Sequence, residues 1–197
     1  MRVKFRPPNR LLARELETER FLLRPVGTFE AMRDPSGWRS DPAILASIYL
    51  GAGPMSLRRW LSIGPIPDGI DRFLFAIVPR GSDQPIGYHF LRPSGYRSVG
   101  NMVGLHDRAW WGKDVVVEVR ARLMNHFYRH GNVERFTGKV SSRNAASIYT
   151  YRKLGYSHAG TQHRESRHGT TGEILDYLCF EMFKDQWMQG PYAEADQ

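Results

Sequence analysis

The chain has 197 residues, of which 41% are hydrophobic and 24% charged, and a formal net charge of +8. These values predict one soluble globular domain with a full hydrophobic core. They exclude a transmembrane protein, because no apolar run approaches the roughly 18 residues that a membrane-spanning helix needs. The N-terminus also lacks the apolar stretch of a secretory signal. The single cysteine, Cys179, cannot form an internal disulfide, which predicts a cytoplasmic protein.

The positive charge is unevenly distributed, because five cations precede the first acidic residue, Glu15. Residues 1–15 are expected to form an extended or loosely docked arm, residues 16–183 the domain, and residues 184–197 a tail. The remaining positive charge suits an anionic ligand. The absence of an interleaved aromatic and basic motif argues against nucleic acid as a partner. Docking of residues 2–14 on ribosomal or other nucleic-acid-rich particles is a weaker alternative.

The first half of the chain predicts short strands and helices. A strand at residues 19–25 ends at a proline. Short helices are expected at residues 28–33, 42–49 and 56–61. Strands are expected at residues 73–78, 85–91 and 98–106, the first two as a hairpin. Gly100 and Gly104 would weaken an ordinary strand, but they suit a strand that splays open to admit a ligand.

The second half of the chain predicts a long helix at residues 113–129. Its apolar side has helical spacing, and its polar side consists of Arg120, Arg122, Asn125 and Arg129. A strand at residues 134–140 and a helix at residues 144–154 follow, and Gly155 ends the helix. Residues 156–162 and 174–183 predict a final strand pair with a loop at residues 169–172. This order of elements indicates a mixed α/β single domain.

A candidate anion site lies at the start of the long helix. Gly112 and Lys113 stand between a strand and a helix, where unpaired N–H groups and a cation suit phosphate oxygens. Taken alone, this pair favours a plain strand-to-helix turn. Asp114 adds a negative charge where phosphates would approach.

Residues 144–156 read NAASIYTYRKLGY, which resembles the N-x-x-S/A-x-x-x-Y-x-x-x-G-F/Y signature of the GNAT superfamily of acyl-CoA-dependent N-acetyltransferases. The closest resemblance is to the ribosomal-protein N-acetyltransferase-like branch. That branch also shows the LETERFLLR opening at residues 16–24, the PIGY strand at residues 85–88 and the WGK helix start at residues 111–113. These motifs follow the order of the family over residues 16–183.

The resemblance implies a single GNAT-like domain of the α/β (α+β) class. Its mixed, mostly antiparallel sheet would be splayed in the middle and carry helices on both faces. It also implies acetyl-CoA as co-substrate and direct attack by a primary amine in a ternary complex. Tyr151 would then be the general acid that protonates the departing thiolate. The residues implied in binding the co-substrate are Val103, Leu105, His106, Trp111, Gly112, Lys113, Asp114, Val115, Val116, Asn144, Ser147 and Tyr151.

Two departures from the family pattern leave alternatives open. Asp114 and Val116 replace small residues of the phosphate loop, which leaves open weakened CoA binding and a role as a sensor or interaction module. Met102 replaces the carboxylate that many relatives carry on the splayed strand. The candidate bases are then His106 and Asp107, or His89 on the neighbouring strand, and deprotonation through water is equally open.

The remaining predictions concern metals and partners. His126 and His130 are four residues apart on a helix but lack a third ligand, so no metal site is predicted. The expected acceptor is a small-molecule or peptide amine, recognised by residues 28–70 and 163–173. No membrane partner is expected. The resemblance allows a homodimer.

Overall fold

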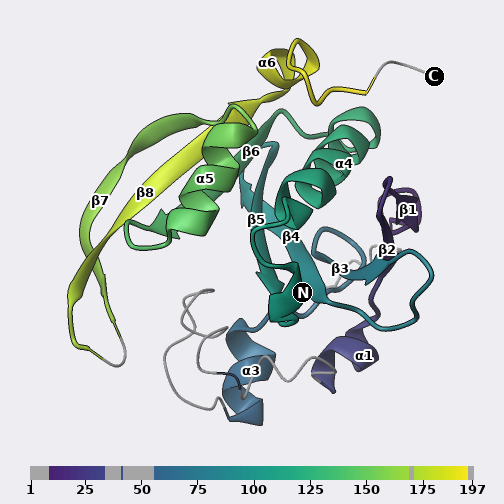
Figure 1. Ribbon diagram of the computed structural model, residues 1–197, viewed down its shortest axis with the longest axis horizontal. Helices are drawn as coiled ribbons and strands as arrows, with labels where there is room; N and C mark the ends of the chain where they lie inside the picture. Colours follow the sequence, from purple (N-terminus) through teal and green to yellow (C-terminus); the bar gives the residue numbers. More distant parts are fainter. Residues whose placement is uncertain (1–8, 34–40, 42–55, 169–170, 195–197) are drawn as a thin grey trace, which may run out of the picture.

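The computed structural model describes residues 9–33, 41, 56–168 and 171–194. Its strands are β1 (Leu16–Glu17), β2 (Phe21–Pro25), β3 (Phe73–Pro79), β4 (Gly87–Gly95), β5 (Ser98–Leu105), β6 (Arg135–Ser141), β7 (Ser157–Arg167) and β8 (Ile174–Phe183). They form one eight-stranded sheet in the order β1-β2-β3-β4-β5-β6-β8-β7 (Figure 1). Neighbouring strands are antiparallel except β5 and β6, which are parallel.

The helices cover both faces of this sheet. They are α1 (Thr28–Met32), α3 (Leu57–Ile63), the 3-10 helix η1 (Arg108–Trp110), α4 (Val115–His130), α5 (Ala145–Lys153) and α6 (Lys184–Met188). Side chains of α4 and α5 share one hydrophobic cluster with the sheet, and those of α1 and α3 share another. The predicted fold class is confirmed. The helix predicted at residues 42–49 lies outside the described residues.

Strand β3 shows why both faces of the sheet must be covered. Phe73 and Phe75 belong to the cluster under α4, whereas Leu74 and Ala76 belong to the cluster under α1 and α3. Successive side chains of a strand point to opposite faces, so a strand that is apolar throughout buries its side chains only between two helical layers.

The polar side predicted for the long helix is wrong at two positions. Arg120 and Asn125 are 2% and 4% exposed and face the interior. Asn125 is satisfied there, because its side chain accepts a hydrogen bond from Trp187 Nε1 (2.6 Å) and donates one to the Tyr192 carbonyl (2.9 Å). Arg120 stands four residues after Val116, within the stripe of side chains that a helix turns toward its core.

The ends of the described chain pack against the domain. Leu12, within the expected arm, is buried, and so is Trp187 of α6, within the expected tail. Sequence patterns did not predict β1, η1 or α6, which have two, three and five residues. Strand β7 continues to Arg167, beyond its predicted end at residue 162. Its pairing with β8 shifts register twice. Within the described ranges, no helix has the length and apolar character that crossing a membrane requires.

Candidate active site

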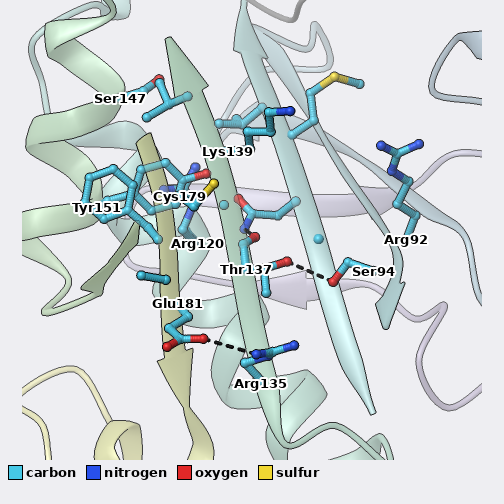
Figure 2. A pocket seen from close by; sticks show the side chains of 18 of the residues that line it. Arg92, Ser94, Arg120, Arg135, Thr137, Lys139, Ser147, Tyr151, Cys179 and Glu181 are labelled. Atoms are coloured by element: carbon cyan, nitrogen blue, oxygen red, sulfur yellow. Dashed lines mark hydrogen bonds and ion pairs between the residues drawn. The ribbon is translucent and has the colours of Figure 1, made fainter. Parts of the chain in front are cut away.

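A cavity of about 700 Å³ lies where the sheet splays (Figure 2). Strands β5 and β6 pair only from Ser98 to Gly100 with Arg135 to Thr137. Beyond Gly100, β5 continues to Leu105 in pairing with β4. The cavity is lined by residues of both strands and by residues of β4, α4, α5, β7 and β8. The predicted splay is therefore present, and its position coincides with Gly100.

Helix α5 contributes two of the predicted residues to the cavity wall, Ser147 and Tyr151 (Figure 2). They are four residues apart and so lie on one face of the helix. Tyr151 is 3% exposed, and its ring stacks on Phe180 with 4.9 Å between centroids. Asn144 caps α5, because its Oδ1 accepts a hydrogen bond from the Ser147 N–H (3.0 Å).

Gly138 of β6 provides the space that Tyr151 occupies. A Cβ atom at position 138 would lie 2.2 to 2.3 Å from Cζ, Cε1 and the hydroxyl oxygen of Tyr151. No side chain larger than glycine fits there without moving the tyrosine. Among the described residues, the Tyr151 hydroxyl has no hydrogen-bond partner. It can therefore donate its proton to a ligand in the cavity.

The start of α4 has the geometry of an anion site. Gly112 and Asp114 adopt positive φ angles of 74° and 55°, and aspartate is among the few non-glycine residues that tolerate this region. The first bond that closes back onto this turn runs from the Glu118 N–H to the Asp114 carbonyl (3.1 Å). Among the described residues, the preceding N–H groups of the helix have no such backbone partners, and they carry its positive dipole end.

Asp114 forms an ion pair that reaches the other helix of the site. Its Oδ2 lies 2.8 Å from Nζ of Lys153 on α5, and this contact raises the pKa of Lys153. The ammonium group of Lys113 instead lies over the Trp110 ring, 5.6 Å from the centroid. The charge that would oppose phosphate at this turn is therefore paired with Lys153 and not with Lys113.

Other residues predicted for co-substrate binding lie along β5 and the α4 start. Val103 lines the cavity. The Leu105 carbonyl accepts a hydrogen bond from Trp111 Nε1 (3.1 Å), which holds the end of β5 against the turn. Val115 is buried and Val116 half-buried.

None of the three candidate bases lines the cavity, whereas Met102 does. The Nε2 atom of His106 hydrogen-bonds a backbone carbonyl (2.9 Å), and the Asp107 carboxylate caps η1. His89 is fully buried. Burial, followed by the charge of Arg120, lowers the pKa of His89 well below its usual value. The identity of the base stays a prediction.

The sequence did not indicate the charge of the cavity wall. The wall carries one carboxylate, Glu181, and four basic side chains, which are Arg92, Arg120, Arg135 and Lys139. Arg135 pairs with Glu181 (3.1 Å), and Lys139 pairs with Glu165 of β7. The cavity is therefore suited to anions. Among the described residues, no three histidine, cysteine or acidic side chains come together as metal ligands.

Comparisons with known proteins agree with this geometry. A model of the acetyltransferase (GNAT) domain matches residues 20–157, more than half of the chain. A search of curated proteins found no match. Solved structures with a similar fold include a ribosomal-protein-S5-alanine acetyltransferase from Vibrio fischeri (TM-score 0.69, 16% identity, 88% of this chain and 98% of that chain covered).

Two further structures show the same likeness. The spermidine N-acetyltransferase of Vibrio cholerae, solved with CoA and spermine, has a TM-score of 0.70 at 14% identity and covers 85% of this chain and 98% of its own. A GNAT-family acetyltransferase from Bacillus anthracis has a TM-score of 0.68 at 14% identity, with 87% and 99% covered. Such low identities show the fold alone, whereas the family model matches the sequence itself. The chain therefore belongs to the GNAT acetyltransferase family.

Proposed function

We propose that the protein transfers the acetyl group of acetyl-CoA to a primary amine while both substrates are bound. The observation that carries this proposal is the Tyr151 hydroxyl, which has no partner among the described residues and stands on the wall of the cavity between β5 and β6. The volume of about 700 Å³ lies in the range of small-molecule sites. It suits a thioester together with a small amine.

The co-substrate would lie between the α4 turn and the cavity. Backbone N–H groups from Gly112 to Val116 would hold its phosphates. The Asp114–Lys153 ion pair supports this placement, because it neutralises the carboxylate at that turn. Beyond Gly100, the edge of β5 that faces β6 is unpaired in the described sheet. It can therefore bind the extended arm of the carrier as an added strand.

The reaction then needs one bond formed and one broken. The amine lone pair attacks the thioester carbonyl carbon, so that a C–N bond forms and the C–S bond breaks. Tyr151 gives its phenolic proton to the thiolate as the sulfur departs, and so acts as the general acid. The proton lost by the amine returns to the phenolate through water. N–H groups of β5 would stabilise the carbonyl oxygen as its charge develops.

Two measurements test this proposal. Isothermal titration with acetyl-CoA should show saturable binding by the wild type and by Tyr151→Phe, because the hydroxyl acts on the leaving group. Thiol release with a panel of amines should fall by roughly 10²- to 10⁴-fold in Tyr151→Phe. Tyr149→Phe is the matched control, since Tyr149 is exposed on the same helix, and it should keep the wild-type rate.

The outcomes separate the two functions that the sequence left open. Absence of acetyl-CoA binding would contradict the transferase proposal and favour an interaction module with this fold. Binding with an unchanged rate in Tyr151→Phe would remove the general-acid role from Tyr151 but leave the transferase proposal standing.

A further inference from the structure

Arg120 is a buried cation whose donors are not satisfied by the protein. It is 2% exposed, and its Nε and Nη1 atoms are buried and have no hydrogen-bond partner among the described residues. A guanidinium group stays charged at any pH at which the protein is folded. The charge of Arg120 has a cation–π contact with the ring of Tyr151, whose centroid lies 4.4 Å from Cζ of Arg120. An aromatic face attracts the charge but leaves the N–H donors unmet.

No described neighbour supplies the missing negative charge. Glu181, the carboxylate on the cavity wall, is paired with Arg135. Asn101 donates its amide to the Thr137 carbonyl (2.9 Å), and its Oδ1 is itself buried without a partner. Neutral His89 adds no negative charge either. An uncompensated charge in a protein interior is strongly destabilising, so this arrangement is one that a bound anion would complete.

The position of Arg120 connects this anion to the reaction. Arg120 lines the cavity together with Asn101 and Tyr151, and Figure 2 shows it beside Tyr151. A group that contacts both residues lies next to the atoms that react in the proposed function. The unmet Nε and Nη1 donors of Arg120 lie on different edges of the planar guanidinium, and Nη2 belongs to both of these edges. A carboxylate can therefore bind with its two oxygens to Nη2 and to one of the two unmet donors.

We propose that Arg120 binds a carboxylate carried by one of the two substrates. This inference rests on the proposed function and narrows it. The carboxylate would end the acyl chain of the thioester, as in a dicarboxylic acyl group, or belong to the acceptor, as in an amino acid. The four cations and single carboxylate of the cavity wall would repel a polyamine acceptor and attract an acidic substrate.

The test compares matched pairs of ligands by isothermal titration with the full chain. Succinyl-CoA and butyryl-CoA have acyl chains of equal length and differ in the terminal carboxylate. The amino acid 4-aminobutyrate and n-butylamine differ in the same way on the acceptor side. Wild type should prefer the carboxylate member of one pair by about tenfold or more, the range for a hydrogen bond to a charged group. The pair that shows the preference identifies the substrate that carries the carboxylate.

Two variants connect the preference to Arg120. Arg120→Met keeps the length of the side chain but removes the charge, and it should reduce the preference to about one while leaving the uncharged ligand unaffected. Arg120→Lys keeps the charge without the planar edge and should retain only part of the preference. Arg122→Met, on the same helix but paired with Glu194, is the matched control and should behave as wild type.

Several outcomes would overturn the inference. The first is that wild type binds both members of each ligand pair with equal affinity. The second is that Arg120→Met keeps the preference for the carboxylate ligand. The third is that Arg120→Met binds both members of a pair more weakly by the same factor. A purely structural Arg120 would also lower the melting temperature when replaced by methionine, whereas removal of an unpaired buried charge should leave it unchanged or raise it. Failure of the proposed function can be distinguished from failure of this inference. If the proposed function is wrong, no CoA thioester binds to wild type, but the affinities of 4-aminobutyrate and n-butylamine still show whether Arg120 binds a carboxylate.

Discussion

The cavity has two faces that differ in whether their cations are exposed and paired or buried and unpaired. On the face that opens between the strands and β8, Arg135 and Lys139 have side chains 37% and 41% exposed, and each is paired with a glutamate. On the face toward α4 and α5, Arg120 is buried and unpaired. Each solvated ion pair contributes roughly 0 to 1 kcal/mol to the stability of the fold, so these pairs can line the cavity with little effect on stability. A buried guanidinium without a partner costs several kcal/mol and points to a ligand.

Buried histidines show how unusual the environment of Arg120 is. His89 and His126 are both buried, and desolvation lowers the pKa of each. A histidine escapes the cost of burial by staying neutral, whereas arginine keeps its charge. Among the described residues, a buried base is therefore either neutral or, in the case of Arg120, placed on the wall of the cavity.

The largest effect is expected from filling the space beside Tyr151. Gly138→Ala places a Cβ within 2.3 Å of the tyrosine ring and hydroxyl, so the ring must move away from the reacting atoms. Thiol release should fall by about a hundredfold, since misplacement by about 1 Å has that cost, and the free energy of unfolding by about 1 to 3 kcal/mol. Gly27→Ala, where a Cβ meets nothing within 4 Å, should change neither. A fully active Gly138→Ala would show that the position of Tyr151 is not critical.

The next largest effect is expected from lowering the pH, which should destabilise the fold because His126 is neutral in the folded protein. Burial, then the charges of Arg14, His130 and Arg122, outweigh a hydrogen bond to the Leu12 carbonyl and lower the pKa of His126 to about 4. The folded pKa lies below the unfolded value near 6.5, so protons bind preferentially to the unfolded chain. This contribution to stability is full above pH 6.5 and is lost as the pH falls toward 4.

Urea unfolding measures this loss, which should be about 2 kcal/mol between pH 7 and pH 5. His126→Gln should remove that part of the pH dependence. His158→Gln, on the exposed strand β7, should leave it in place. An unchanged slope in His126→Gln would mean that the pKa of His126 is the same in the folded and the unfolded chain.

The smallest effect is expected on the solvated face. Glu181→Gln breaks the pair with Arg135, and the free energy of unfolding should fall by less than about 1 kcal/mol. The difference between variant and wild type should shrink further in high salt, because exposed charges are screened. A salt-independent loss of about 3 kcal/mol or more would place this pair in the same class as a buried one and remove the contrast with Arg120.

The sequence predicted the parts of the fold that have strong periodicity or a family motif. The long helix, the strand after it and the helix that carries Tyr151 are present within two residues of their predicted ends. The short elements β1, η1 and α6 were missed because two to five residues carry no measurable period. Strand β7 was ended too early because its exposed, charged residues resemble a loop, although pairing with β8 holds them extended.

Only those residues of the candidate site that belong to a local sequence motif could be predicted. Ser147 and Tyr151 of the motif at residues 144–156 both lie on the cavity wall, and their roles stay predictions. Asn144 belongs to that motif but serves as a helix cap. The partner of Asp114 was not predictable, because Lys153 is 39 residues away in sequence. Arg120 had a usable signal, since it occupies an apolar position of its helix, but charge alone had placed it on the solvent side.

The irregular edge strand β7 also bears on how the protein behaves at high concentration. A regular strand at the margin of a sheet offers a ladder of unpaired N–H and C=O groups to other chains. In β7 the register shifts between His158 and Gly160 and again between Gln162 and Ser166, and Arg164 has a φ of 54°. Its last residues include the charged side chains Arg164, Glu165 and Arg167. This edge therefore resists sheet extension between molecules and protects the protein from aggregation.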